Sequence, residues 1–402
     1  MWPVCTGLTP PWTVTGADFD AEARRLDIRI DFPSGSRFAC LACPACGATG
    51  CPPHDTAPTT WRHLNFFQHQ AYLNARVPRV RCDTCGVTKV TVPWAREGSG
   101  FTLLFEALIM AMIPAMPVKA AERLVDAYDT RLWRVIHHYV EEARVRADAS
   151  AVTRVAIDET AARRGHDYIS LFADIDEARV IHVTEGKDAA TVAAFAEDLT
   201  AHGGGPDQIA EACIDMSPAF IKGVAEHLPN AKVTFDKFHI VKIVNDAVDE
   251  VRRTERKTHA ELKGTRYIRL RNPDTLSQRQ RATLDALPTR TLKTARAYQI
   301  RLAFQDMYAE AGVEAATAYL KKWYFWATHS RVPPMIDAAH TVKRHWDGIL
   351  RWFDSKIANG VIEGINSLVQ AAKAKPRGYR STRNLKAMVY LIAGKLDLRL
   401  PT

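Results

Sequence analysis

The sequence has no apolar run that is long and uninterrupted enough to cross a membrane. Its strongest apolar stretch, residues 101–118, is broken by Glu106, Pro114 and Pro117. The N-terminal residues lack a basic segment followed by an apolar one, so we expect no signal peptide, no membrane contact and a cytoplasmic location. The chain contains no internal repeat either.

The sequence has few cysteines and fewer acidic than basic residues. Only 8 of the 402 residues are cysteine, and the apolar and charged fractions of 47% and 25% are ordinary for a soluble globular protein. These values exclude a disulfide scaffold, a collagen-like chain and a disordered one. Asp and Glu number 45 against 54 Lys and Arg, so the formal net charge is +9. The length predicts two or three domains.

The positive charge is concentrated toward the C-terminus. Residues 241–300 contain 14 basic and 7 acidic residues, and residues 371–400 contain 8 basic and 1 acidic. Such an excess indicates a polyanionic partner, and a phosphate backbone would lie most naturally along this part of the chain. The alternative for any single Lys/Arg cluster is a solvated helix face.

The first 150 residues change from a strand-like to a helical pattern. Residues 1–100 are rich in Pro, Gly, Cys and His, with strand-like runs at residues 70–77 and 87–92. Residues 117–124 and 129–136 then predict two short helices joined by a tight turn, with Asp129 or Thr130 as the second N-cap. Such a pair is typical of a helix-turn-helix, and an ordinary helical hairpin is the alternative.

Strands and helices alternate from residue 154 onward. The expected strands are residues 154–158, 168–175, 179–183, 209–216 and 232–235, and the expected helices are residues 189–199 and 218–228. This order predicts a mixed α/β sheet. No strand is expected between residues 241 and 359, where the pattern is helical.

Two matched Cys-x-x-Cys-Gly segments predict a zinc site. They are Cys43–Cys46 and Cys82–Cys85, separated by 35 residues that must fold as an insert. The glycine after each pair permits the turn that directs both sulfurs at one metal, and four thiolates suit tetrahedral Zn²⁺. Three further residues are either alternative ligands or ordinary packing and surface residues: Cys40, Cys51 and His54.

Three acids are candidates for catalysis. Asp158 and Asp215 each end a predicted strand, and Glu363 lies on a helix that begins near Asn359. Carboxylates at the carboxyl ends of neighbouring strands meet at one edge of a sheet. With a third acid from a helix they would form an oxygen-rich pocket for two Mg²⁺ ions, which can clamp the attacking and leaving oxygens of a phosphodiester exchange. A single Asp at a strand end is more often a cap or turn residue, and it is the three acids together that favour a metal site.

The helix that carries Glu363 has a polar face. Its members recur at spacings of 4, 3 and 4 residues: Asn359, Glu363, Asn366 and Gln370. This spacing directs one face toward the metals and DNA. Basic residues that follow are candidate phosphate contacts: Lys373, Lys375, Arg377 and Arg380. Basic residues of the helix pair are further candidates for DNA contact: Lys119, Arg123, Arg131 and Arg134.

Several motifs, in order from about residue 40 to the C-terminus, resemble the ISL-three family of bacterial insertion-sequence transposases. They are the two Cys pairs, Trp61-Arg62-His63-Leu64, residues 75–82, the helix pair at 117–136, Ile157-Asp158-Glu159-Thr160, Asp215-Met216-Ser217-Pro218-Ala219-Phe220, Phe235-Asp236-Lys237-Phe238-His239 and Asn359-Gly360-Val361-Ile362-Glu363-Gly364-Ile365-Asn366. The resemblance implies an RNase H-like domain whose DDE triad maps onto Asp158, Asp215 and Glu363. It also implies an N-terminal zinc-binding region and a helix-turn-helix that bind terminal inverted repeats.

The expected fold is therefore an α/β multidomain protein with four parts. These are a zinc ribbon-like domain at residues 1–98, a helix-turn-helix region at 99–150, an RNase H-like catalytic domain at 151–244 and 346–402, and an all-helical insertion at 245–345. Related transposases place such an insertion between the second and third acids, and 147 residues lie between them here. Within it, residues 321–326 (Lys-Lys-Trp-Tyr-Phe-Trp) either stack unpaired bases or form a buried aromatic helix face.

Three residues near the triad are possible accessories. Asp236 and His239 form an Asp-x-x-His motif that resembles a signature of several DDE superfamilies, and His239 is expected either to contact phosphate or metal or to be structural. Asp236 is an alternative to Asp215 as a metal ligand. Glu159 follows Asp158 directly, and neighbours on a strand face opposite ways, so we expect Glu159 to lie outside the metal site.

These features together predict a DDE transposase that binds its element's ends, cuts them and joins them to target DNA. We expect structural Zn²⁺, two catalytic Mg²⁺ ions, a homodimer or higher oligomer on double-stranded DNA, and association with the nucleoid. A zinc and helix-turn-helix regulator with an inactive nuclease fold is the alternative, and a repair or RNase H-type nuclease is a third possibility. The presence of all three acids argues against an inactive fold.

Overall fold

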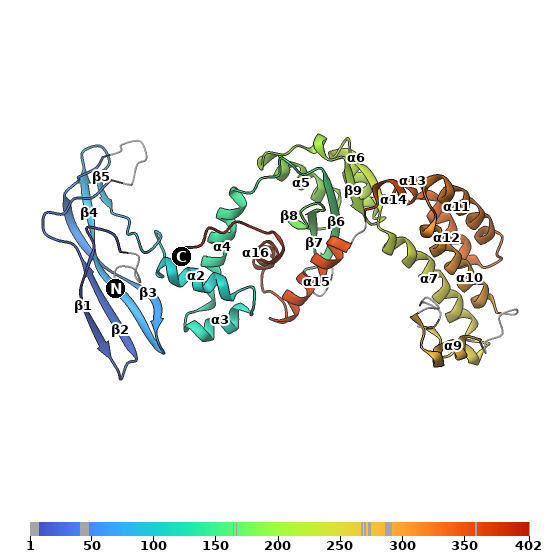
Figure 1. Cartoon of the computed structure of the whole chain (residues 1–402), viewed down its shortest axis with the longest axis horizontal. Helices are drawn as coiled ribbons and strands as arrows, with labels where there is room; N and C mark the ends of the chain where they lie inside the picture. Colours follow the sequence, from blue (N-terminus) through green and yellow to red (C-terminus); the bar gives the residue numbers. More distant parts are fainter. Residues whose placement is uncertain are drawn as a thin grey trace. The chain divides into compact units, whose positions relative to one another are not determined.

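The computed structural model describes residues 8–40, 48–163, 165, 167–266, 268, 271, 275–285, 292–357 and 360–401. The chain divides into two compact units, Met1–Ala143 with Leu398–Thr402, and Arg144–Asp397. Figure 1 labels their elements. In the described part of the chain, no helix is both long enough and apolar enough to cross a membrane.

The first unit begins with a five-stranded sheet in the order β1-β2-β4-β3, and β5 pairs with the end of β4. The strands are β1 (Thr13–Asp20), β2 (Arg25–Asp31), β3 (Pro53–Phe66), β4 (His69–Cys82) and β5 (Gly86–Lys89). The predicted runs at 70–77 and 87–92 thus correspond to β4 and β5, although β5 is shorter than its run. Buried tryptophans fill one side of this sheet, since the ring of Trp94 lies 5.0 Å from that of Trp12 and 5.5 Å from that of Trp61.

Three helices follow the sheet: α2 (Leu103–Met112), α3 (Val118–Val125) and α4 (Asp129–Val145). The predicted helix pair is confirmed as α3 and α4. α3 ends at Asp126, which has a left-handed backbone (φ 50°) and turns the chain toward α4. The sequence had suggested Asp129 or Thr130 as the N-cap of α4. In the structure both are instead the first residues inside the helix. α4 also extends beyond residue 136, because buried residues continue at helical spacing as far as Ala143.

The second unit contains a mixed sheet in the order β10-β9-β6-β7-β8. Its strands are β6 (Arg154–Ala161), β7 (Tyr168–Asp174), β8 (Arg179–Glu185), β9 (Glu211–Ile214) and β10 (Lys232–Phe235). β6, β7 and β8 pair antiparallel, whereas β9 pairs parallel with both β6 and β10. All five predicted strands are therefore present, and β6 lies at the centre of the sheet.

Helices lie against this sheet. α5 (Ala189–Ala201) packs on β8 and on α6 (Pro218–His227). Val155 and Ile157 of β6 share a buried apolar cluster with α5 residues. The alternate residues of β6, Ala156 and Asp158, face the other side, where α15 (Gly360–Ala374) contacts β6 and α16 (Thr382–Ala393) contacts β8.

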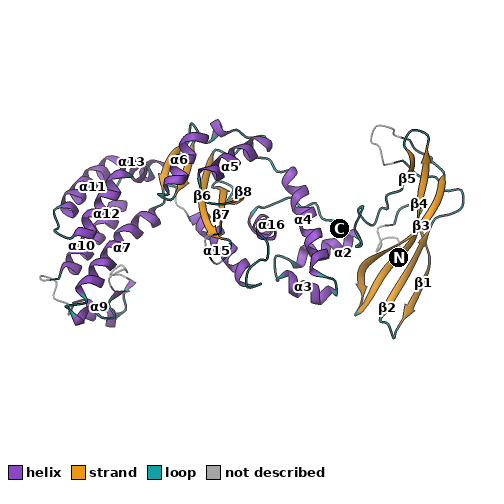
Figure 2. Ribbon diagram, turned by 180° about the vertical axis from the view of Figure 1, so that it is seen from behind, coloured by secondary structure: helices purple, strands orange, loops and turns teal. Residues whose placement is uncertain are grey.

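A run of helices follows β10. It comprises α7 (Lys237–Glu255), α9 (Gln278–Asp285), α10 (Lys293–Asp306), α11 (Val313–Thr328), α12 (Pro333–Arg344), α13 (Trp346–Leu350) and α14 (Trp352–Ser355), with the short 3₁₀ turns η2 (Ala260–Leu262) and η4 (Met307–Ala309). α7 packs against α10 and α12, and α11 packs against α10 and α12. Figure 2 shows this run as helical throughout, and the described residues between 241 and 357 contain no strand, as the sequence predicts.

Candidate active site and zinc cluster

The parallel pairing of β6 with β9 brings two of the predicted acids to one edge of the sheet. The last paired residues of this ladder are Ala156 and Cys213, and Asp158 and Asp215 each follow two residues later. Adjacent strands lie about 4.8 Å apart. The two half-buried carboxylates therefore emerge at the same level of neighbouring strands. The charge of Asp215 raises the pKa of Asp158, which is consistent with this proximity.

Asp158 is held by hydrogen bonds to both of its carboxylate oxygens. The backbone N–H of Glu159 donates to Oδ1 over 2.8 Å, and the side-chain amide of Asn366 donates to Oδ2. Burial raises the pKa of Asp158 to about 6, against the lowering effect of the Glu159 N–H. The carboxylates of Glu159 and Asp215 raise it further, and His239 lowers it. The acids are thus crowded enough for their charges to repel.

The helix α15 runs beside β6 and is joined to it by polar contacts at successive turns. Asn366 contacts Asp158, Gln370 Nε2 donates to Thr160 Oγ1, and Lys373 Nζ donates to the carbonyl oxygen of Ala161. The predicted polar face of this helix therefore does face the strand that carries Asp158. Asn359 lies outside the described residues.

Glu363 is exposed on α15, three residues before Asn366. Residues at this spacing share one helix face, so the helix that contacts Asp158 also carries the third predicted acid. Its backbone carbonyl accepts a hydrogen bond from Ser367 Oγ over 2.9 Å.

Asp215 and Asp236 each accept a backbone hydrogen bond at the start of a helix. Asp215 Oδ1 accepts a hydrogen bond from the N–H of Ser217, immediately before α6. Asp236 is the N-cap of α7, where its Oδ1 accepts from the N–H of Phe238 over 3.1 Å. Asp236 is 4% exposed, and its Oδ2 lies 3.7 Å from Nε2 of His239. The nearby His239 lowers the pKa of Asp158, so it lies within electrostatic range of the acids.

Glu159 is closer to these charges than the alternation of a strand suggests. Burial raises its pKa, and the carboxylate of Asp215 raises it further, while Lys187 and His239 lower it. Its backbone N–H donates to Asp158 Oδ1. That Glu159 lies outside the metal site stays a prediction.

The basic residues of the helix pair differ in their surroundings. Lys119 lies 2.6 Å from Glu122 on α3, and Arg123 and Arg134 are exposed. Arg131 packs with its guanidinium 4.0 Å from the ring centre of Phe101 and donates to the carbonyl oxygen of Gly100. Burial lowers the pKa of Arg131. Arg131 therefore has an evident packing role, which a sequence pattern of exposed cations does not reveal.

Beyond α15, the predicted phosphate contacts Lys375, Arg377 and Arg380 are exposed. Arg163, from the segment after β6, donates to the backbone carbonyl of Arg380. Burial also lowers the pKa of Lys373, which donates to the Ala161 carbonyl oxygen. This end of the helix thus keeps cations close to the strand that carries Asp158.

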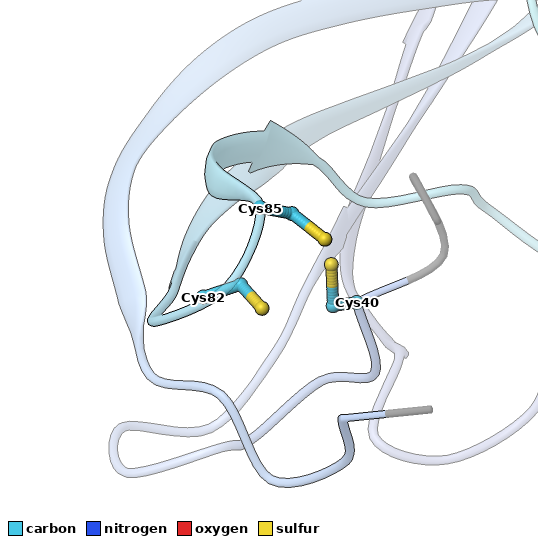
Figure 3. Close-up of side chains that lie close together, drawn as sticks. All are labelled: Cys40, Cys82 and Cys85. Carbon is cyan, nitrogen blue, oxygen red and sulfur yellow. The ribbon is translucent and has the colours of Figure 1, made fainter. Parts of the chain in front are cut away.

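A cluster of three cysteines lies in the first unit. The sulfur atoms of Cys40, Cys82 and Cys85 all lie within 4.8 Å of one another, and Figure 3 shows them directed toward a common point. Cys82 pairs with Gly86 at the start of β5, and Gly86 has a positive φ of 75°, so this glycine does form the predicted turn. Three thiolates in this arrangement suit Zn²⁺.

Cys40 is the unexpected member of this cluster. Its backbone N–H donates to the carbonyl oxygen of Ala48, and Phe38 forms a bridge with Cys51, so the chain doubles back and directs Cys40 at the second Cys pair. Cys43 and Cys46 lie outside the described residues. Among those described, Cys51 and His54 do not belong to the cluster. The sequence left open whether Cys40 is a ligand. The signal that favours it is its three-residue spacing from Cys43, the same spacing as within each Cys pair.

A thiolate cluster, a helix-turn-helix and carboxylates at the edge of a mixed sheet define a DNA-binding enzyme of the transposase class. Three family models agree: "Transposase" over residues 155–389, "Helix-turn-helix domain of transposase family ISL3" over 90–140, and "zinc-finger of transposase IS204/IS1001/IS1096/IS1165" over 41–85. The chain belongs to the ISL3 family of transposases.

Two relatives extend this similarity over most of the chain. The transposase for insertion sequence element IS1557 of Mycobacterium tuberculosis is 29% identical over 367 residues, which cover 82% of this chain and 80% of the relative. The transposase for insertion sequence element IS1001 of Bordetella parapertussis is 26% identical over 354 residues, which cover 85% and 86%. The protein is thus a DNA-binding transposase, and a regulator with an inactive nuclease fold is not favoured.

Proposed function

We propose that this transposase binds the terminal inverted repeats of its insertion sequence, cleaves the DNA strands there and joins them to target DNA. We assign the catalytic role to Asp158, Asp215 and Glu363. The observation that carries this assignment is the common position of Asp158 and Asp215 on adjacent parallel strands, beside a helix that bears Glu363. These acids are far apart in sequence, with 147 residues between Asp215 and Glu363.

The proposed catalytic domain is RNase H-like and consists of residues 151–244 and 346–402. Three antiparallel strands followed by two parallel ones, with β6 at the centre, support this assignment. Residues 245–345 would form an all-helical insertion, supported by the run of helices that follows β10. Residues 1–98 and 99–150 would form the zinc-binding and helix-turn-helix regions.

The donor set suits hard divalent cations, since carboxylate oxygens are the ligands that Mg²⁺ prefers. Two Mg²⁺ ions held by the three acids would stabilise charge on the attacking and leaving oxygens of the phosphodiester. The crowding that raises the pKa of Asp158 fits such a site, because a bound cation would offset the repulsion between the carboxylates.

The protein's own residues then position the reactants. Asn366 and the Glu159 N–H hold the Asp158 carboxylate in one orientation, so little reorganisation is needed when DNA binds. His239 lies in the first turn of α7, with its Nε2 3.7 Å from Oδ2 of Asp236, and is proposed to contact the scissile phosphate. Asp236 itself is proposed as a supporting residue, because its N-cap hydrogen bond and its burial hold it at the start of α7.

DNA contacts are proposed for two groups of basic residues. Those of the helix pair are Lys119, Arg123, Arg131 and Arg134, and those after the catalytic helix are Lys373, Lys375, Arg377 and Arg380. The exposed members of both groups would contact phosphates, with Arg able to do so bidentately. We further propose that the protein acts on the nucleoid as a homodimer or higher oligomer.

A structural zinc ion is proposed to be held by Cys40, Cys82 and Cys85. The approach of three sulfurs within 4.8 Å supports this set. A tetrahedral site needs one more ligand, for which Cys43 and Cys46 are the candidates from the sequence.

The proposed activity is tested by Mg²⁺-dependent cleavage of a labelled duplex carrying the element's end, beside a gel shift on the same DNA. Asp158→Ala, Asp215→Ala and Glu363→Ala should each abolish cleavage and strand joining, while end binding is retained or tightened because fewer carboxylates repel the phosphates. Asp236→Asn should have a milder effect. Robust cleavage by Glu363→Ala would overturn the triad.

A further inference from the structure

The aromatic run at residues 321–326 is divided between two faces of α11. Trp323 is buried, its ring centre lies 4.7 Å from that of Phe304, and its Nε1 donates to the carbonyl oxygen of Ile300. This residue therefore belongs to the core of the helical segment. The sequence had left open whether the whole run forms a buried aromatic helix face. That interpretation is correct for Trp323.

The exposed part of α11, beside the buried stripe that contains Trp323, combines aromatic rings with cations. Phe325 is 64% exposed and Trp326 is 41% exposed. Lys321 and Lys322, one turn earlier, are also exposed. Residues four apart on a helix lie on the same side, so each lysine lies beside one of these rings. We call these four residues the α11 face.

A second aromatic side chain packs against the ring of Phe325. The imidazole of His329 stacks on its ring at 4.1 Å between ring centres and 27° between planes, and Nδ1 of His329 lies 2.8 Å from the Phe325 carbonyl oxygen. One side of the Phe325 ring is thus covered by an aromatic neighbour, which restricts its rotation. A ring held in this way can receive a planar partner on its free side with little further loss of entropy.

Helix formation does not explain this surface. Phe and Trp have lower helix propensity than Ala, and Phe325, which is 64% exposed, gains little from burial. Protein interfaces favour aromatic residues but are depleted in lysine. Paired lysines and exposed rings are instead the combination by which proteins bind single-stranded nucleic acid, with bases stacked on rings and phosphates held by cations.

We propose that the α11 face binds single-stranded DNA, with bases stacked on Phe325 and Trp326 and phosphates contacted by Lys321 and Lys322. The helix-turn-helix is a separate DNA-binding element. The proposal goes beyond duplex recognition and does not depend on the catalytic triad.

The test compares the full-length protein with a Phe325→Ala/Trp326→Ala variant by fluorescence anisotropy. The probes are a labelled oligo(dT) of about 20 nucleotides, longer than a typical single-strand site, and a duplex of equal length. Loss of two stacking platforms should weaken oligo(dT) binding at least about tenfold. Duplex affinity should change by less than about twofold, because base faces are covered in a duplex. Thermal unfolding should remain well above the assay temperature, with a modest decrease from the buried part of Trp326, which is 41% exposed.

Salt dependence separates the two kinds of contact. Lys321→Ala/Lys322→Ala should lower the slope of log K against log salt for oligo(dT) by about 1.4, because each lost phosphate contact in a single strand removes roughly 0.7. The aromatic variant should keep the slope of the unaltered protein. A Phe325→Tyr/Trp326→Phe variant, which keeps two rings, should retain most of the affinity.

Phe67→Ala is the matched control, since Phe67 is an 81% exposed aromatic in the turn between β3 and β4. It should bind oligo(dT) like the unaltered protein. Unchanged oligo(dT) binding by Phe325→Ala/Trp326→Ala, or an equal loss in Phe67→Ala, would overturn the proposal. A change in oligomeric state by light scattering with oligo(dT) affinity intact would also overturn it and assign the α11 face to protein contact.

Discussion

The side-chain amide of Asn366 donates a hydrogen bond to Oδ2 of Asp158, between residues 208 positions apart in the sequence. The donor must be Nδ2, because an ionised carboxylate only accepts. Oδ1 of Asn366 is buried, and no residue in the described ranges donates to it. This contact joins α15 to the central strand, so the orientation of the first acid depends on the helix that carries the third.

Replacement of Asn366 tests this dependence. Asn366→Ala should raise the Mg²⁺ concentration needed for half-maximal cleavage, or lower the cleavage rate, by about 10- to 100-fold, as is usual for residues that orient metal ligands. Gln370→Ala is the matched control, because it removes a contact to Thr160 and not to a carboxylate. Similar Mg²⁺ dependence in both variants, with Asp158→Ala inactive, would assign Asn366 a purely structural role.

The pKa of Asp158 predicts a pH-dependent stability. Burial raises this pKa to about 6, above the value near 3.9 of an unfolded chain. Protonated Asp158 therefore contributes its full share to the free energy of unfolding below about pH 4, and this contribution is lost as pH rises through about 6. Asp158→Asn cannot ionise, so without added Mg²⁺ it should be more stable than the unaltered protein by about 1–2 kcal/mol at pH 7.5. Thermal unfolding at pH 4.5 and pH 7.5 measures this, and an equal difference at both pH values would contradict it.

The cysteine cluster predicts the metal content of the first unit. The purified protein should hold about one Zn²⁺ per chain, and Cys40→Ser and Cys82→Ser should each lower this occupancy. Cys51→Ser is the control, since Cys51 is a buried cysteine outside the cluster. In the Co²⁺-substituted protein, Cys40→Ser should reduce thiolate-to-metal absorption by about a quarter. Normal occupancy and an unchanged spectrum would instead favour Cys43 and Cys46 with the second pair.

The helix pair predicts a salt-dependent DNA affinity. Replacing Lys119, Arg123 and Arg134 together by Ala should lower the slope of log K against log salt for duplex DNA by about 2.7, if each contacts one phosphate. Arg131→Ala should mainly destabilise the first unit, because its guanidinium packs on Phe101 and bonds to Gly100. Anisotropy titrations at several salt concentrations measure the slope. An unchanged slope in the triple variant would make the pair only a packed hairpin.

Two glycines of the second unit predict opposite changes in stability. A Cβ at Gly348 of α13 would lie 2.4 Å from the ring of Phe235, the last residue of β10, so Gly348→Ala should cost about 1–3 kcal/mol through overpacking. Gly364 in α15 has nothing within 4 Å of such an atom, so Gly364→Ala should stabilise by about 0.5–1 kcal/mol. Thermal unfolding of both variants tests the pair. Equal shifts in one direction would contradict the packing argument.

Local patterns predicted much of this protein. The five strands of the second sheet, the helix pair and the turn at Gly86 depend on short-range alternation, helical spacing and backbone freedom, which neighbouring residues determine. The neighbouring positions of Asp158 and Asp215 could be found in the same way, because parallel strands bring their carboxyl ends to one edge. Asp158 does not end its strand as the sequence predicted, since β6 pairs with β7 as far as Ala161.

Other features depend on which surfaces meet. Spacing alone could not tell that Arg131 covers Phe101, that Cys40 turns toward Cys82, or that Trp323 is buried while Phe325 is exposed. Each of these follows from contacts between segments distant in sequence. The residues themselves thus determined the helices, the strands and the chemistry available at their ends. The tertiary structure decided which of these side chains are buried, because a helix or strand specifies its faces but not the neighbour that covers them.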